Sequence, residues 1–284
     1  MEMLATMFLI VSLLSGIIYA HLEDPICDEL GINMYEDIGC QAVKKNNSIC
    51  PIKYECNFSG NDRQCVFKGI TYSMADGFAI DFTYEKCNVM CLCLFPGGKF
   101  RCSIKDCPQW KGVFLKPGCY NKYEVNKCCA VSQTCPAFHK EPEGCEVDGV
   151  TYRIGEKFRP KLTCLTCICT KNFKSEYSEP DCQRMSCAVE INDADKVQQK
   201  CAPYYETTDD NPICCPLGWI CQKVSDDVIT LNPEVNNDPD FICEFGKTKL
   251  QLSEGLYTEI KLNGTIKQAK CECIMPPLLT CRNI

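Results

Sequence analysis

Apolar and polar residues alternate over short stretches of this chain, and no long segment has an apolar period of 3.6 residues. The clearest short stretch is Val150-Thr151-Tyr152, which follows Gly149 and predicts a hairpin strand. Gly155 predicts the next turn, and Ile168, placed between two cysteines, predicts an inner strand. The pattern therefore predicts short strands joined by tight turns, and no helix.

One apolar run is longer, and it lies near the N-terminus at Met7–Ile18. A run of this length that ends close to a small residue, Ala20, is typical of a signal peptide, here residues 1–20. It is shorter than the roughly 20 residues that a membrane-spanning helix needs. No second apolar run approaches this length. We therefore expect a secreted, extracellular protein with no membrane span after signal cleavage.

Cysteine is the residue that changes the picture most, with 28 among 284 residues. Such a density is typical of oxidising compartments, and an even number allows every thiol to have a partner. Zinc sites usually mix cysteine with histidine, and the chain has two histidines. We therefore expect a disulfide framework, with no metal and no cofactor.

The cysteines form a repeat. Residues 65–135 and 145–221 carry the same ten-cysteine series, in which a C-x-C, a C-x4-C, an adjacent pair and a closing C-x5-C follow in order. We call the part of each module with cysteines one to five its front half and the rest its back half. Residues 21–64 form a partial module with a back half only, the leading half. Residues 243–284 form a partial module with a front half only, the trailing half, after an acidic linker at 222–242.

The cysteines missing from the two partial modules indicate one bond of the full modules. Of the back-half positions six to ten, the leading half lacks position eight. Of the front-half positions one to five, the trailing half lacks position two. Each partial module therefore keeps an even number of cysteines. If positions two and eight are bonded to each other, neither half leaves a thiol unpaired. This arrangement predicts Cys87–Cys128 in module one and Cys164–Cys214 in module two.

The series resembles the von Willebrand factor type C module, also called the chordin-type cysteine-rich repeat. The resemblance is carried by Cys145, Gly149, Tyr152, Gly155, Phe158, Cys164, Cys167, Cys169, Cys214, Cys215 and Cys221. It implies a small disulfide-rich fold of tandem modules, each a short antiparallel β-sheet plus an irregular disulfide-stapled subdomain. It further implies the pairs Cys145–Cys169, Cys167–Cys182, Cys187–Cys215 and Cys201–Cys221.

The same resemblance implies an extracellular protein that binds a protein ligand, and proteins with such modules often bind growth factors of the bone-morphogenetic type. The net charge of −7 argues against a nucleic-acid partner. His139 is the one histidine within the module array, in the turn-like segment PAFHKEPEG, so no nucleophile–base pair is evident and we expect no enzyme. Three sequons suit a secretory route and mark Asn46, Asn57 and Asn263 for glycosylation.

The strand signals place the expected ligand contacts on the front halves, because the back halves lack such signals. In module two the candidate contacts are Val147, Val150 and Ile168. The corresponding candidates in module one are Phe67, Ile70 and Leu92. Tyr72 and Tyr152 are expected to be core rings.

Two alternatives remain open. The spacing Cys87-Asn88-x2-Cys91-x-Cys93 also resembles pacifastin-type serine-protease inhibitors. In those proteins the inhibitory bond lies between the last two cysteines, which here implies Arg184–Met185 or a bond within Ser103–Asp106. The other alternative is an extracellular matrix or innate-immunity protein without a growth-factor partner.

Overall fold

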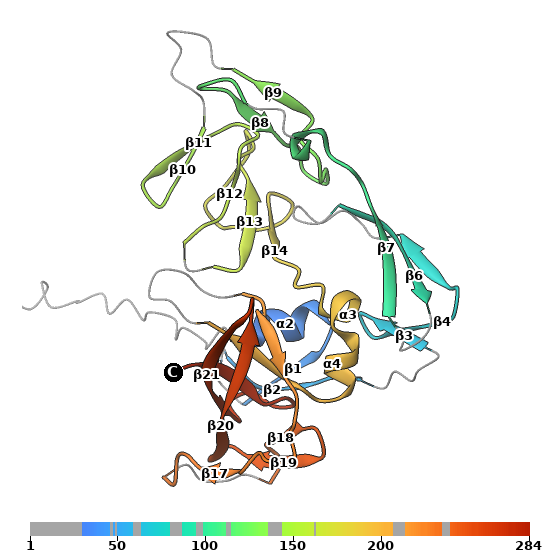
Figure 1. The fold of residues 1–284 in the computed structure, drawn as a ribbon. Helices are drawn as coiled ribbons and strands as arrows, with labels where there is room; N and C mark the ends of the chain where they lie inside the picture. Colours follow the sequence, from blue (N-terminus) through green and yellow to red (C-terminus); the bar gives the residue numbers. More distant parts are fainter. Residues whose placement is uncertain are drawn as a thin grey trace, which may run out of the picture.

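A computed structural model shows an array of small β-sheets (Figure 1). It describes residues 30–45, 48, 50–58, 64–79, 87–94, 99–111, 115–135, 144–161, 163–206, 214–234 and 239–284. The predicted signal peptide and Asn46 lie outside these residues. The expected fold class is confirmed, because the described part consists mainly of short antiparallel strands with few helices and 13 disulfides.

The leading half begins with helix α2 (Ile32–Asp37), whose first residues Ile32–Tyr35 are buried. Strands β1 (Gln41–Lys44) and β2 (Pro51–Glu55) follow as an antiparallel pair. The disulfide Cys40–Cys56 ties the two ends of this hairpin.

The two full modules repeat one topology: a two-stranded hairpin, then a three-stranded sheet, then a hairpin in the back half. The elements of module one are β3 (Gln64–Phe67), β4 (Ile70–Ser73), β5 (Gly77–Ala79), β6 (Asn88–Leu94), β7 (Lys99–Ile104), the 3₁₀ turn η1 (Pro108–Trp110), β8 (Tyr120–Lys122) and β9 (Ser132–Thr134). Those of module two are β10 (Gly144–Val147), β11 (Val150–Arg153), β12 (Lys157–Phe158), β13 (Leu165–Ile168), β14 (Cys182–Arg184), α3 (Val189–Asn192), α4 (Ala194–Gln198), β15 (Ala202–Tyr205) and β16 (Gly218–Ile220).

The first hairpin of module two turns at Asp148 and Gly149, which both have positive φ angles (53° and 75°). Two consecutive residues with positive φ form a type I′ turn, the turn that matches the twist of a two-residue hairpin. Lys68 and Gly69 form the same turn in module one, with φ angles of 49° and 74°. Gly69 and Gly149, each four residues after the opening cysteine of its module, are therefore needed for this turn.

The last part of the chain builds the largest sheet. This part of the chain has β17 (Ile229–Thr230), β18 (Ile242–Phe245), β19 (Thr248–Gln251), β20 (Glu254–Leu262), β21 (Thr265–Glu272) and β22 (Thr280–Asn283). Strands β18 and β19 pair separately as a hairpin, and the other four belong to the large sheet. Module two contributes β15 and β16, which gives the strand order β16-β15-β22-β21-β20-β17. The trailing half therefore shares a hydrophobic core with the back half of module two, in which Tyr204 and Ile220 pack with Leu250 and Leu256.

The leading half and the trailing half also meet, as the blue and red segments of Figure 1 show. The buried Tyr35 hydroxyl donates to the Met275 carbonyl (3.2 Å) and accepts from the Leu278 amide (3.0 Å). The Tyr54 amide donates to the Pro276 carbonyl at 2.8 Å. These two segments and helices α3 and α4 share a second core. Each partial module thus completes its core with its neighbours, because a half-module is too small to form one alone.

Two expectations from the sequence are wrong. The chain does contain helices: α2, α3 and α4 have four to six residues each, too few to show a 3.6-residue apolar period. The back halves also contain strands, since β1–β2, β8–β9 and β15–β16 are all paired. Within the acidic linker, β17 pairs with β20 at the edge of the large sheet.

Candidate functional site

The proposed contact residues of module two do not form one surface. Val147 and Ile168 are buried, so their prediction as ligand contacts is wrong. Val147 packs in the module core with Phe158 and the disulfide sulfurs. Val150 is 46% exposed on the hairpin strand β11 and remains available to a partner. Tyr152 lies against this core, as expected, with its ring stacked on Phe158 at 4.6 Å between centroids.

The back half of module one packs against the front sheet of module two. The Tyr123 amide donates to the Gly155 carbonyl (2.7 Å), and the Tyr120 hydroxyl donates to the Ile154 carbonyl (3.1 Å). The Tyr123 ring lies under the Lys157 ammonium, 4.5 Å from the ring centroid. Lys157 stands directly opposite Ile168 in the sheet, so both side chains are on the face that Tyr123 approaches.

The equivalent face in module one is open. Strand β6 carries Met90, Leu92 and Leu94 at alternate positions, while Cys91 and Cys93 between them are buried. Met90 is 47% exposed, whereas Thr166, its counterpart before the C-x-C of module two, is 1% exposed. Among the described residues, none of the leading half hydrogen-bonds to the turn Ala75–Asp76, which corresponds to the turn that Tyr123 contacts in module two.

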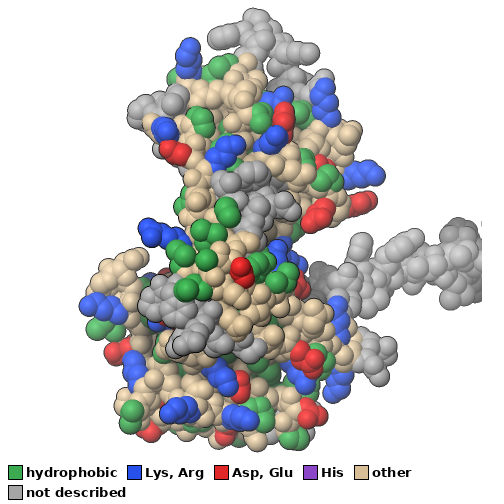
Figure 2. Space-filling model, turned by 90° about the vertical axis from the view of Figure 1, so that its right-hand side faces the viewer, with side chains coloured by type: hydrophobic (Ala, Val, Ile, Leu, Met, Phe, Trp, Pro, Cys, Tyr) green, Lys and Arg blue, Asp and Glu red, His purple; other side chains and the backbone are tan. Residues whose placement is uncertain are grey.

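This apolar face is defined here by Met90, Leu92 and Leu94, and we call it the β6 face. Strand β6 lies on the side of Figure 1 that Figure 2 turns toward the viewer, and hydrophobic side chains gather at mid-height on that side. Leu92 is half-buried because it lies over Gly77, where an added Cβ would be 2.5 Å from its Cδ2 atom. Ile70 and Met74 add exposed apolar surface on the same module.

Basic side chains flank the β6 face. Arg101 stands opposite Leu92 and Lys99 opposite Leu94 in the register of β6 and β7, so they share its side of the sheet. Lys99 pairs with Asp195 at 3.1 Å. Arg101 is exposed and makes no ion pair with any residue the structure describes. The face therefore offers an apolar strip with a cationic side chain available to an acidic partner.

The proposed inhibitory bond of module two is held on both sides. Arg184 ends strand β14, and its guanidinium pairs with Glu36 at 3.0 Å. The Met185 amide donates to the Cys164 carbonyl (2.9 Å), and its carbonyl accepts from the Asn33 side chain (3.0 Å). A protease needs this backbone for its own hydrogen bonds, so the geometry disfavours Arg184–Met185 as an inhibitory bond. In module one the segment Ser103–Asp106 is exposed, although the Lys105 amide makes the equivalent hydrogen bond to the Cys87 carbonyl at 2.6 Å.

One disulfide in each full module joins its front half to its back half. The structure pairs Cys87 with Cys128 and Cys164 with Cys214, the partners inferred from the missing cysteines. The pairs implied by the resemblance are present too: Cys145–Cys169, Cys167–Cys182, Cys187–Cys215 and Cys201–Cys221. Module one has the same pattern throughout.

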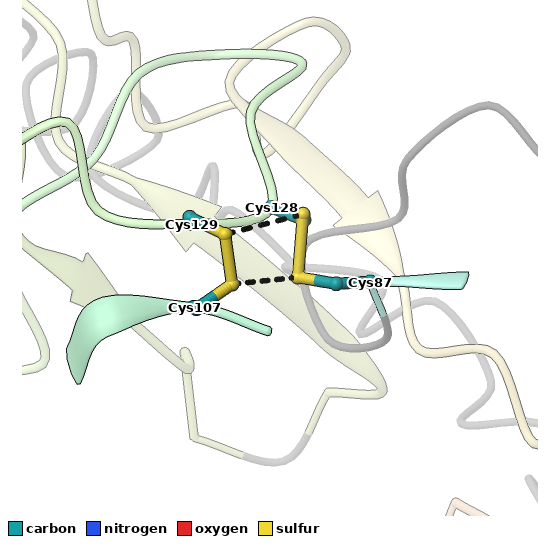
Figure 3. A group of neighbouring side chains, drawn as sticks. All are labelled: Cys87, Cys107, Cys128 and Cys129. Carbon is teal, nitrogen blue, oxygen red and sulfur yellow. Dashed lines mark hydrogen bonds between the residues drawn. A yellow bond between two sulfur atoms is a disulfide. The ribbon is translucent and has the colours of Figure 1, made fainter. Parts of the chain in front are cut away.

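Two disulfides of module one lie side by side, as Figure 3 shows. The sulfurs of Cys87, Cys107, Cys128 and Cys129 are all within 4.8 Å of one another. The Cys87 and Cys107 sulfurs are 3.2 Å apart and those of Cys128 and Cys129 are 3.8 Å apart; a disulfide sulfur carries no hydrogen, so both are contacts between bonds. Four thiolates at this spacing could hold a zinc ion, but bonded sulfurs are poor ligands.

Sequence reasoning missed Met90 and Leu94. The signal was present, because cysteines on alternate positions of a strand must point to one face and leave the residues between them on the other. It also missed Asp37 and Glu190, two half-buried carboxyl groups that lie between segments far apart in sequence. Burial raises the pKa of both, that of Glu190 to about 8.

Within the described residues, no helix is long and apolar enough to cross a membrane. Comparison of the chain with protein families, with curated proteins and with solved structures finds no match. The resemblance to the type C module therefore depends on the cysteine series and the residues quoted with it.

Proposed function

We propose that the protein is a secreted array of type C-like modules that binds an extracellular protein ligand through the β6 face of module one. The disulfides fit an extracellular location, because bonds of this number persist in oxidising compartments. The observation that supports the binding site is a comparison within the chain. One face of the front sheet is covered by the preceding back half in module two and is open in module one.

The chemistry of the β6 face defines the partner. Apolar strips on rigid supports favour partners with apolar side chains, because a few desolvated contacts supply most of the binding free energy. Arg101 favours an acidic group beside them. A growth factor of the bone-morphogenetic type, which the resemblance implies, is the first ligand to test.

Substitution on the β6 face tests the proposal. Met90→Glu places a charge in the apolar strip, and we expect it to weaken binding to a dimeric bone-morphogenetic-type growth factor by at least about tenfold in surface plasmon resonance. Val131→Glu is the matched control, because Val131 has a similar exposure (43%) in the back half of module one, outside the β6 face. A binding loss with Val131→Glu and none with Met90→Glu would refute the proposed site.

For the alternative function as a serine-protease inhibitor, one candidate segment remains, Ser103–Asp106 of module one. Ile104 in module one is 66% exposed between Cys102 and Cys107. It is an apolar residue and would enter the specificity pocket of a chymotrypsin-type or elastase-type protease. Inhibition of such a protease by the full chain, abolished by Ile104→Asp, would favour this function over the binding array.

A further inference from the structure

A cavity lies where three parts of the chain meet: the leading half, the turn between β3 and β4, and helices α3 and α4. Its volume is about 170 Å³. Apolar side chains line part of it, among them Ile38, Phe58, Val66 and Val197. The polar part consists of the carboxyl groups of Glu55 and Glu190 and the amides of Gln41, Asn57 and Gln198.

Glu190 sets the chemistry of this cavity. Its carboxyl oxygens accept from the Lys68 amide at 2.9 and 3.0 Å. Burial, together with the nearby Asp37, raises the pKa of Glu190 to about 8, although the hydrogen bond from the Lys68 amide lowers it. The carboxyl group is therefore largely protonated at neutral pH and can donate or accept a hydrogen bond. Apolar walls with neutral amides and a carboxyl suit a sugar, whose ring faces are apolar and whose hydroxyl and acetamide groups are polar.

Asn57 is a predicted glycosylation site at this cavity. It begins the sequon Asn57-Phe58-Ser59, it is exposed, and it lines the cavity. Asn263 begins another sequon in very different surroundings. It lies at the tip of the β20–β21 hairpin, where a Cβ added to Gly264 would meet nothing within 4 Å.

We propose that Asn57 carries an N-linked glycan and that its innermost N-acetylglucosamine occupies this cavity, where it joins the leading half to both modules. The proposal rests on the secretory route of the proposed function. In the transfer, a bond forms between Asn57 Nδ2 and sugar C1. The bond from C1 to a lipid-linked pyrophosphate carrier breaks, and the amide loses one proton. The chain then folds around the attached sugar.

Enzymatic deglycosylation of the native full-length protein from culture medium tests this. We expect peptide N-glycanase to release the Asn57 glycan at least about tenfold more slowly than the Asn263 glycan, because access requires local opening. After denaturation the two rates should be equal. Equal rates in the native protein would overturn the proposal. A secreted protein with a glycan at Asn263 and none at Asn57 would also overturn it, while leaving secretion and ligand binding intact.

Filling the cavity gives an independent readout. Gln198→Phe places a ring in the cavity, and we expect it to raise the native release rate at Asn57 to that at Asn263. Gln199→Phe is the matched control, because Gln199 is exposed and does not line the cavity. An unchanged rate in Gln198→Phe would contradict the proposal.

Thermal unfolding tests whether the innermost sugar on Asn57 stabilises the protein, and this test does not use Gln198→Phe. Asn57→Gln should lower Tm by about 2–4 °C, whereas Asn263→Gln should not. Trimming every glycan to a single N-acetylglucosamine should leave the wild-type Tm unchanged, because the innermost sugar remains. A Tm for Asn57→Gln equal to that of the wild type would show that the cavity is empty.

Discussion

At the residue scale, two half-buried carboxyl groups lie where distant segments meet. Asp37 of the leading half accepts from the amides of Cys187 (2.8 Å) and Ala188 (3.1 Å) in module two. Glu190 on α3 accepts from Lys68 in module one. Burial raises the pKa of both groups. Contacts between modules therefore depend on pH.

Glu190 predicts the sign of that dependence. Its pKa of about 8 in the folded protein exceeds its ordinary value of 4.5. Between these values the folded state holds a proton that the unfolded state has lost, so the free energy of unfolding falls as pH rises through this window. We expect Tm to fall from pH 6 to pH 9, and Glu190→Gln to flatten this change. A Glu190→Gln profile parallel to the wild type would contradict the assignment.

At the residue scale, the sequence predicted correctly the disulfides that depend on cysteine spacing alone. The partial modules lack positions two and eight, and the structure bonds those positions, because a bond absent from both ends leaves no thiol unpaired. It failed for Ile168, because the residue that approaches its face, Tyr123, belongs to the preceding module. No local pattern specifies which neighbour covers a sheet face.

At the element scale, the bond between positions two and eight ties a front half to a back half. Cys164→Ser would leave Cys214 unpaired next to Cys215, which invites mispairing. We expect the double variant Cys164→Ser/Cys214→Ser to be secreted better than the single variant, because the partial modules fold without this bond. Secretion yields from parallel expression measure the difference, and equal yields would contradict the two-half description of the module.

The paired disulfides of module one predict an exchange reaction. A small thiolate that attacks the half-buried Cys129 releases the Cys107 thiolate, whose sulfur is close to that of Cys87. Attack there forms Cys87–Cys107 and releases the Cys128 thiolate. This thiolate displaces the small thiol from Cys129 and forms Cys128–Cys129, with no net oxidation.

Module two is the control for this exchange, because the Asn33 amide lies against its Cys187 and Cys215 sulfurs at 3.3 and 3.9 Å. Brief treatment with a monothiol, followed by alkylation and peptide mapping, should find Cys87–Cys107 in module one while module two keeps Cys164–Cys214. New pairs in module two alone would contradict the prediction.

At the scale of the whole molecule, Tyr35 joins the leading half to the trailing half. Its hydroxyl is buried and has two backbone partners in the trailing half, 240 and 243 positions away. Tyr35→Phe leaves both partners unsatisfied, so we expect a loss of about 1–3 kcal/mol of stability. Tyr54→Phe is the matched control, because the buried Tyr54 hydroxyl bonds to the exposed Glu36 side chain at 3.4 Å, a neighbour within the leading half. Equal losses in denaturant unfolding would contradict this role of Tyr35.

This contact between the leading half and the trailing half could not be predicted from the sequence. The cysteine series identified the leading half and the trailing half as two partial copies of the module, but spacing does not specify which surfaces pack. The contact depends on the side chains of α2 and on the segment Met275–Leu278 between the last two disulfide-bonded strands. Both lack the periodicity from which sequence patterns are read.

The contact of Tyr35 with Met275 and Leu278 also determines the order in which the chain can mature. A ribosome synthesises Tyr35 long before it has synthesised Leu278. Until then α2 can pack only against module two, through Val189 and Val197, and the Tyr35 hydroxyl has neither of its backbone partners. The first described helix is thus among the last to be completely buried, because its remaining partners come from the segment just before the final strand.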